Sequence, residues 1–245
     1  MNFLKKFLSG IAIFSTFSAI PNSYGETIVR PSKLETRFYE MGFRNSSTGE
    51  FASVFSSSEG QLVDLSSSNS VQTLSENVQL TNSGTFDQMY VLVSNTVSMT
   101  GDTGSGCYIK SGEYSYNSGD IQATTTNASL SGTAIVTEIG FGGINATSSS
   151  LSSYKTTPAV SSSVNGEAVN NLTLYLVNGT SRNPGEGGPY NRYLYLGDLQ
   201  DSINLSTTKK GTLWIDTDTS ESVSIDTGCT SFNWGNTKFG LSVEQ

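Results

Sequence analysis

The chemistry open to this chain is limited by a residue type that it lacks, because the sequence contains no histidine. Ser-His-Asp and Cys-His nucleophile systems need an imidazole base, and histidine is the commonest ligand of zinc. The pattern Ser-x-x-Lys, which can place a lysine beside a nucleophilic serine, occurs at Ser152–Lys155 and Ser206–Lys209. In a chain with 41 serines such matches are expected by chance. We therefore expect no enzyme of these classes.

One segment carries carboxylates at closely spaced positions, namely Asp216, Asp218 and Glu221. Because Ca²⁺ takes oxygen ligands from such segments, these residues form a candidate calcium site. The central glycine of an EF-hand loop is missing, and a solvated acidic hairpin turn is the favoured alternative. We expect no other cofactor.

The densest aromatic and basic cluster consists of Tyr190, Arg192, Tyr193 and Tyr195. On a strand, Tyr193 and Tyr195 share one face and Arg192 lies on the other. An exposed set of tyrosines, together with the Gly- and Pro-rich loop 181–189, would bind a glycan or a protein. A half-buried cross-strand aromatic set is the alternative.

Two-carboxylate glycoside hydrolysis needs only aspartate and glutamate, so a carboxylate-based secreted hydrolase stays open. No carboxylate pair is singled out by its position. The two tryptophans, Trp214 and Trp234, fall in predicted strands, where a core position is favoured over a sugar-binding platform.

The two cysteines, Cys107 and Cys229, are predicted to form one disulfide, since the chain is expected to be exported. Closing a loop this long is worth about 4–5 kcal/mol in the chain-entropy treatment. Two free thiols are the alternative.

The first 25 residues predict a signal peptide. Lys5 and Lys6 precede the apolar run 7–20, and Ser23 and Gly25 provide small residues at positions −3 and −1 of a cut. The run is shorter than the roughly 20 residues of a membrane span, so no transmembrane segment is expected. We expect a mature chain that starts at Glu26 and is extracellular, on the cell surface or periplasmic.

The mature chain would hold 11 basic and 21 acidic side chains, a net charge of −10. Binding to nucleic acid depends on clustered lysine and arginine that displace counterions. The sequence therefore argues against a nucleic-acid partner.

Composition and periodicity predict an all-β protein. Serine and threonine total 69 residues, glycine adds 25, and only 14% of the residues are charged, which disfavours helices. Apolar residues alternate along short segments, most clearly at 34–43, 86–94, 133–141, 171–177 and 211–217. We expect one antiparallel β-sandwich or jelly-roll-like domain over 26–245, with long loops at 145–169 and 181–189 and a short helix within Asp198–Asn204.

The segment 26–43 is predicted to be an extended N-terminal strand. Such a strand could complete a sheet of a neighbouring copy, or it could be the protein's own edge strand or a tail. In composition and expected architecture the chain resembles secreted β-sandwich subunits of bacterial surface fibres. We therefore expect a secreted or cell-surface structural or adhesive protein that assembles with itself. A secreted module that binds a glycan or other ligand is the first alternative, and the hydrolase is the second.

Overall fold

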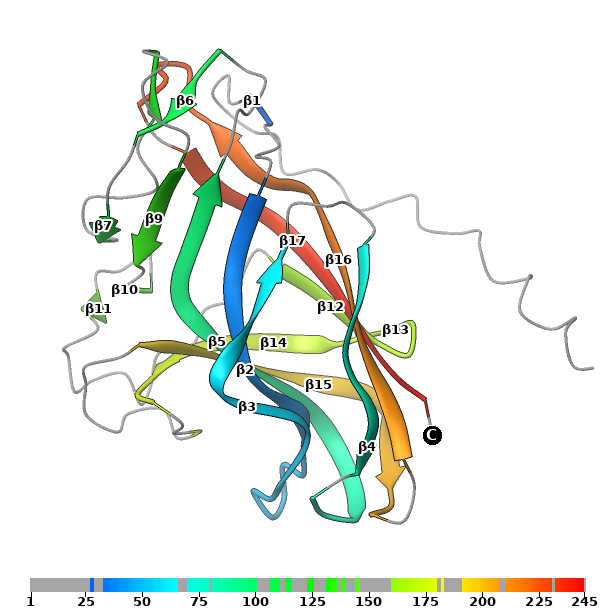
Figure 1. Ribbon diagram of the computed structural model, residues 1–245. Coiled ribbons are helices and arrows are strands. Elements are labelled where there is room, and N and C mark those ends of the chain that lie inside the picture. The colour runs from blue at the N-terminus through cyan, green and yellow to red at the C-terminus, as the bar shows by residue number, and fades with distance from the viewer. Residues whose placement is uncertain are drawn as a thin grey trace, which may run out of the picture.

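Figure 1 presents the computed structural model of the chain. The structure describes residues 27–28, 33–65, 70–79, 81–100, 106–110, 113–115, 123–125, 131–135, 138–139, 144–145, 160–179, 182, 191–207, 210–230 and 232–244. The predicted signal peptide lies outside these residues.

All regular structure in these ranges is β-strand, as predicted. The strands are β1 (Thr27–Ile28), β2 (Lys33–Arg44), β3 (Phe51–Asp64), β4 (Ser70–Gln79), β5 (Gly84–Thr100), β6 (Tyr108–Ile109), β7 (Glu113–Ser115), β8 (Ala123–Thr124), β9 (Ser131–Ile135), β10 (Glu138–Ile139), β11 (Ile144–Asn145), β12 (Val160–Val164), β13 (Glu167–Ala168), β14 (Asn170–Val177), β15 (Arg192–Leu205), β16 (Lys210–Ile225) and β17 (Phe232–Glu244). Within the described part of the chain no helix is long and apolar enough to cross a membrane.

A seven-stranded sheet runs in the order β14-β15-β5-β2-β3, and β9 joins it by pairing with both β5 and β7. All pairs along that order are antiparallel, whereas β7 and β9 are parallel. β2 and β5 lie at the middle of the sheet and curve along their length (Figure 1). This sheet carries the candidate site described below.

A six-stranded sheet runs in the order β1-β16-β17-β12-β13, and β4 also pairs with β16. β16 and β17 form a long antiparallel hairpin that crosses the view diagonally in Figure 1. β12 pairs in parallel with β17, and the other pairs are antiparallel. Two short antiparallel ribbons, β6–β8 and β10–β11, complete the described strands.

The curvature of the seven-stranded sheet comes from shifts of register. Phe38 and Glu40 are two residues apart on β2, whereas their partners on β5, Val93 and Leu92, are consecutive. The extra residue, Tyr39, therefore makes a β-bulge, and such bulges increase the local bend and twist of a strand. The register between β2 and β3 also shifts at this point, because Phe38 pairs with Gln61 and Glu40 pairs with Ser56.

Three clusters of buried apolar residues hold the described strands together, and the third is described with the candidate site. The larger lies mainly on one face of the seven-stranded sheet and includes Val164 of the six-stranded sheet: Phe38, Met41, Phe43, Ala52, Val54, Phe55, Val63, Phe86, Met89, Val91, Val93, Val164 and Leu205. The second joins strands of both large sheets: Leu34, Met99, Ile109, Ile225, Cys229 and Phe232. Burial of this much apolar surface is the main stabilising contribution to the fold.

The short helix expected within Asp198–Asn204 is wrong, because these residues belong to β15. Against β5, Asp198 pairs with Gln88 and Ile203 with Phe86, so β15 bulges between these positions. Both Leu199 and Ile203 pack against the larger apolar cluster. Their spacing of four residues suits one face of a helix, but residues four apart also share a face of a strand, so this spacing does not distinguish the two structures.

The hairpin turn expected around Asp216–Glu221 is also wrong. β16 continues through this segment with one irregularity of register between Asp218 and Glu221. The chain reverses later, between the end of β16 at Ile225 and the start of β17 at Phe232. β3 runs without a break through residues 56–60, where Gly60 has a φ of 73°.

The expected loop 145–169 contains β12 and β13. The segment 171–177, predicted as a strand from its alternation, belongs to β14, which lies at an end of the order β14-β15-β5-β2-β3. In that order β2, the main part of the predicted N-terminal strand, is an interior strand.

Candidate functional site

The face of the seven-stranded sheet that is opposite the larger apolar cluster carries a different set of side chains. Its buried centre consists of Tyr90, Leu92, Val177 and Leu194, with Tyr39, Phe51, Tyr175 and Leu196 packed around it. Three guanidinium groups lie over aromatic rings of this set: those of Arg44, Arg182 and Arg192. We call this surface the arginine face.

A partly buried ion pair lies in the arginine face. The Nε of Arg182 donates to Oε2 of Glu40 at 3.2 Å, and its Nη2 donates to Oε1 at 2.5 Å. The side chain of Glu40 is 8% exposed and that of Arg182 is 34% exposed. Two parallel N–H···O bonds of this kind fix the orientation of both groups. The pair therefore attaches residue 182 to the middle of β2.

Glu40 is further stabilised by two hydroxyl groups. The hydroxyl of Tyr90 donates to Oε1 at 2.7 Å, and that of Ser53 also donates to Oε1. A buried carboxylate needs such partners, because an unpaired buried charge is costly. Burial, and next the nearby charge of Glu40, raise the pKa of Tyr90 far above its ordinary value. Tyr90 therefore stays a neutral hydrogen-bond donor.

The bulge in β2 explains why a carboxylate occupies this position. Phe38 belongs to the larger apolar cluster, so a regular strand continuing from it would place Tyr39 on the arginine face and Glu40 on the cluster face, yet Met41 also belongs to that cluster. The extra residue in the bulge allows both Tyr39 and Glu40 to lie on that face. The local irregularity thus places the ion pair.

The other two arginines lie at opposite ends of the arginine face. Arg192 stacks on the ring of Tyr39, with 3.5 Å between its guanidinium carbon and the ring centroid. Arg44 lies 5.6 Å from the centroid of Phe51 and donates to Oε1 of Gln88 at 2.5 Å. Phe51 is also contacted by Arg182, at 4.9 Å. Stacking of this kind holds a guanidinium flat while leaving its N–H edge available to an acceptor.

The predicted aromatic cluster divides between the two faces of β15. Tyr193 and Tyr195 pack against the larger apolar cluster, with 6.3 Å between their ring centroids. Arg192 lies on the arginine face, as the alternation predicted. Burial raises the pKa of Tyr195 to about 12. Tyr190 and most of the loop 181–189 lie outside the described residues, and ligand binding by this cluster stays a prediction.

The predicted calcium ligands lie in the interior of a strand. Asp216 pairs with Gly240, Asp218 with Lys238 and Glu221 with Asn236 in the β16–β17 register. Asp218 thus lies opposite a basic residue in the register. The side chains of Asp216, Asp218 and Glu221 lie outside the described residues, as do those of Trp214 and Trp234. No group of three or more His, Cys, Asp or Glu suited to a metal ion occurs among the side chains that the structure describes.

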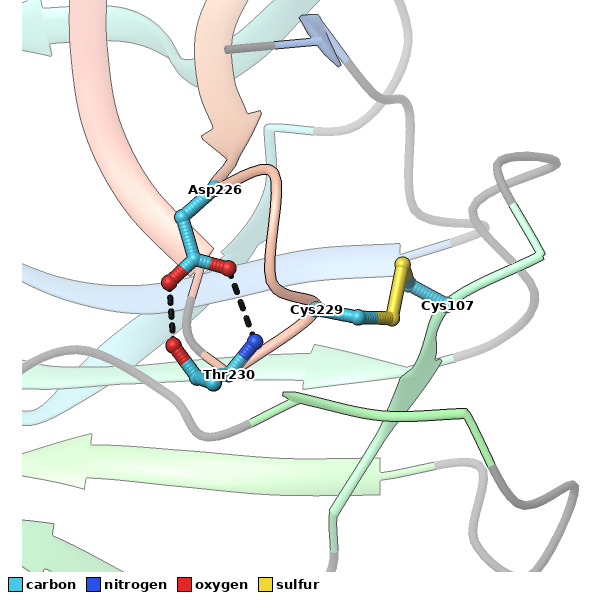
Figure 2. Close-up of a disulfide and its surroundings, with 4 residues drawn as sticks. All are labelled: Cys107, Asp226, Cys229 and Thr230. Carbon is cyan, nitrogen blue, oxygen red and sulfur yellow. Dashed lines mark hydrogen bonds between the residues drawn. A yellow bond between two sulfur atoms is a disulfide. The ribbon is translucent and has the colours of Figure 1, made fainter. Parts of the chain in front are cut away.

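The predicted disulfide is confirmed. Cys107 and Cys229 are bonded, with 5.7 Å between their Cα atoms, and Cys229 lies in the turn between β16 and β17. Figure 2 shows Asp226 closing this turn through both carboxylate oxygens. One accepts from the backbone N–H of Thr230 at 2.7 Å, and the other accepts from its hydroxyl. The hydrogen bonds of Asp226 thus fix the conformation of the turn, and the disulfide links the turn covalently to Cys107.

Sequence reasoning missed the ion pair. Glu40 was detectable as a charged residue within the otherwise apolar and aromatic run 38–43. Arg182 gave no local signal, since it lies 142 residues from its partner in the sequence. It also belongs to the Gly- and Pro-rich segment 181–189, whose sequence does not indicate a contact with the sheet.

Comparison of this chain with models of known protein families, with curated proteins and with solved structures found no match. The function must therefore be argued from the residues and their geometry alone.

Proposed function

We propose that this protein is an exported structural or adhesive subunit of the cell surface, which assembles with itself by exchanging its N-terminal strand. The unit would be one β-sandwich domain of residues 26–245 after removal of the signal peptide. The apolar cluster that joins both large sheets supports this sandwich arrangement, and the disulfide supports an oxidising location.

One observation carries the assembly proposal. β1, which begins two residues after the predicted cleavage site, lies at an end of the six-stranded sheet and pairs antiparallel with the last residues of β16. The register joins Thr27 to Ile225 and Ile28 to Ser224. Because β1 is short and lies at an edge, the same pairing can form with a neighbouring copy at little cost. The exchange would leave β2 in its own sheet.

The exchange has a geometric requirement. β2 is flanked by β3 and β5, so residues 33–44 cannot leave their sheet without breaking two ladders of hydrogen bonds. The hinge must therefore lie within residues 29–32, which include Pro31. A fully extended segment of this length spans about 13 Å.

A cysteine pair across the register tests the proposal directly. In the mature chain with Ile28→Cys and Ser224→Cys, oxidation should cross-link β1 to its acceptor strand. Strand exchange predicts a ladder of covalent multimers on non-reducing gels. A cross-linked monomer alone would contradict exchange. As the control, Ile28→Cys with Ser222→Cys keeps both cysteines but moves one away from the partner of Ile28.

Light scattering tests assembly without new cysteines. The mature chain should form large assemblies, and a chain lacking residues 26–33 should remain monomeric. Replacing both Thr27 and Ile28 by proline removes two backbone donors and should have the same effect as the deletion. Replacing both by alanine keeps the donors and should preserve most of the assembly. Monomers in all four cases would refute the proposal.

A ligand-binding module is the second candidate, and the arginine face is the observation that favours it. The carboxylate-based hydrolase gains less support, because Glu40, the buried carboxylate on that face, already accepts bonds from Arg182, Tyr90 and Ser53.

A further inference from the structure

The arginine face brings together three of the few basic residues of an acidic chain. Their guanidinium groups follow β2 and β5, with Arg44 paired to Gln88 at one end and Arg192 paired to Ser94 at the other. Arg182 lies between them, bound to Glu40, which pairs with Leu92. From Gln88 to Ser94, a strand rises about 20 Å. The guanidinium groups are therefore spread along a line and do not surround a single point.

Neither outer arginine forms an ion pair with a carboxylate in the described part of the chain, whereas Lys33 pairs with Glu35 and Arg182 with Glu40. Arg44 donates to the neutral amide of Gln88 and is influenced by the charge of Asp87. That carboxylate, however, accepts its hydrogen bonds from Ser46. Arg192 is held by the ring of Tyr39.

Both outer arginines are also ordered in a way that suits recognition of carboxylates. A guanidinium stacked on a ring has already lost much of its conformational freedom, so it loses less on binding. Its N–H edge can then form two parallel bonds to one carboxylate. Each of these side chains is half-buried, so part of it reaches solvent.

We propose that the arginine face binds a linear carboxylated polysaccharide along β2 and β5, with Arg44 and Arg192 each binding a sugar carboxylate. Well-separated anionic groups on one chain match the spread of the two arginines, and the half-buried rings of Tyr39 and Phe51 would contact sugar rings. Duplex nucleic acid carries one phosphate charge per roughly 1.7 Å, a density that two arginines about 20 Å apart do not match. The inference goes beyond the proposed assembly and does not require it.

Binding of the mature chain to immobilised hyaluronate, a linear polysaccharide with a carboxylate in each disaccharide, tests the proposal. We expect saturable binding that weakens with added salt. Arg44→Gln and Arg192→Gln should each reduce the affinity about tenfold, the change that corresponds to 1.4 kcal/mol. Lys33→Gln, which removes an exposed charge beyond the line of arginines, should change it by less than about twofold.

Three further comparisons decide the outcome. Uncharged dextran should not bind, and equal binding to dextran sulfate or duplex DNA would overturn the proposal in favour of general attraction to polyanions. Failure to bind hyaluronate, or an equal loss with Lys33→Gln, would also overturn it. Circular dichroism checks that each variant folds. If Arg192→Gln does not fold, Arg192→Lys replaces it. This variant keeps the positive charge but loses the planar guanidinium, so it should bind hyaluronate more weakly than the parent protein. The deletion of residues 26–33 tests assembly separately, so the two proposals can fail independently.

Discussion

At the level of single residues, the most unusual feature is a buried charged side chain in the middle of β2, an interior strand of the seven-stranded sheet. Glu40 is buried, yet its two oxygens accept bonds from Arg182, Tyr90 and Ser53. Such pairs contribute modestly to stability as a whole, but the loss of one partner leaves the other uncompensated. The main effect of the ion pair is therefore to fix the position of residue 182 on the sheet, and its contribution to the net free energy of folding is smaller.

Removing either partner should destabilise the protein. Glu40→Gln and Arg182→Met should each lower the free energy of unfolding by about 2–3 kcal/mol, because the remaining charge stays on the sheet without its counterion. The double variant should cost less than the sum of the two single changes. Urea unfolding followed by circular dichroism measures all three.

The control for this cycle is an exposed pair. Lys33→Gln breaks the Lys33–Glu35 contact at 3.4 Å and should change the free energy of unfolding by less than about 1 kcal/mol. If Glu40→Gln cost no more than this control, the central role of the ion pair would be refuted.

Tyr195 should make stability depend on alkaline pH. Burial raises its pKa in the folded protein to about 12, against an ordinary value of 10.0. Between these values the unfolded chain releases the proton while the folded chain keeps it, so stability is complete below pH 10 and falls as the pH rises towards 12. The fall attributable to this residue is at most about 3 kcal/mol, since each unit of pKa difference corresponds to about 1.4 kcal/mol.

The Tyr195→Phe variant has no hydroxyl to titrate, so its stability should fall less steeply over the same alkaline range. Thermal unfolding across that range measures the slope for both proteins. Identical slopes would show that the hydroxyl of Tyr195 is not the group that titrates.

At the level of elements, the β-bulges decide which predictions succeeded. β2 and β5 were recognisable because alternation of apolar residues holds over most of their length. The helix expected at Asp198–Asn204 and the turn expected at Asp216–Glu221 failed where register shifts interrupt that alternation. A bulge depends on the partner strand, so a single segment of sequence carries little sign of it. Alternation correctly placed Arg192 on the face of β15 opposite Tyr193 and Tyr195. It could not predict the contact between Glu40 and Arg182, because these residues lie 142 positions apart in the sequence.

Gly42 shows how closely β2 and β3 approach at one such irregularity. A Cβ atom at this position would lie 2.1 Å from the backbone oxygen of Ala52. Gly42→Ala should therefore lower the free energy of unfolding by about 3 kcal/mol, since backbone on both strands would have to shift. Chemical denaturation checks this value.

Gly197 provides the matched comparison. A Cβ there would lie 2.2 Å from the side chain of Val169, which can rotate away more easily than backbone can move. Gly197→Ala should thus cost less than Gly42→Ala. The reverse order would mean that the β2–β3 contact is looser than the structure indicates.

At the level of the whole molecule, the disulfide connects regions that are far apart in the sequence. Cys229 packs with Leu34 and Met99 of one large sheet and with Ile225 and Phe232 of the other. The bond therefore reinforces the place where the two sheets meet.

Replacing both cysteines by serine should lower the free energy of unfolding by about 4 kcal/mol, because the bond closes a loop with a sequence separation of 122 residues. Denaturation with and without reductant measures the change in the parent protein and in the variant. The parent under reducing conditions should approach the variant. A variant as stable as the oxidised parent would show that packing alone holds this junction.

The same long separation has a consequence for the order in which the chain folds. β2 and β5 can pair soon after both have been synthesised, whereas Cys107 has to wait for β16 and the turn that follows it. During that interval its thiol is free to react with the wrong partner, and the longer the wait, the greater the exposure to mixed disulfides. Efficient maturation should therefore depend on a thiol–disulfide exchange catalyst more strongly than the final stability of the folded protein would suggest.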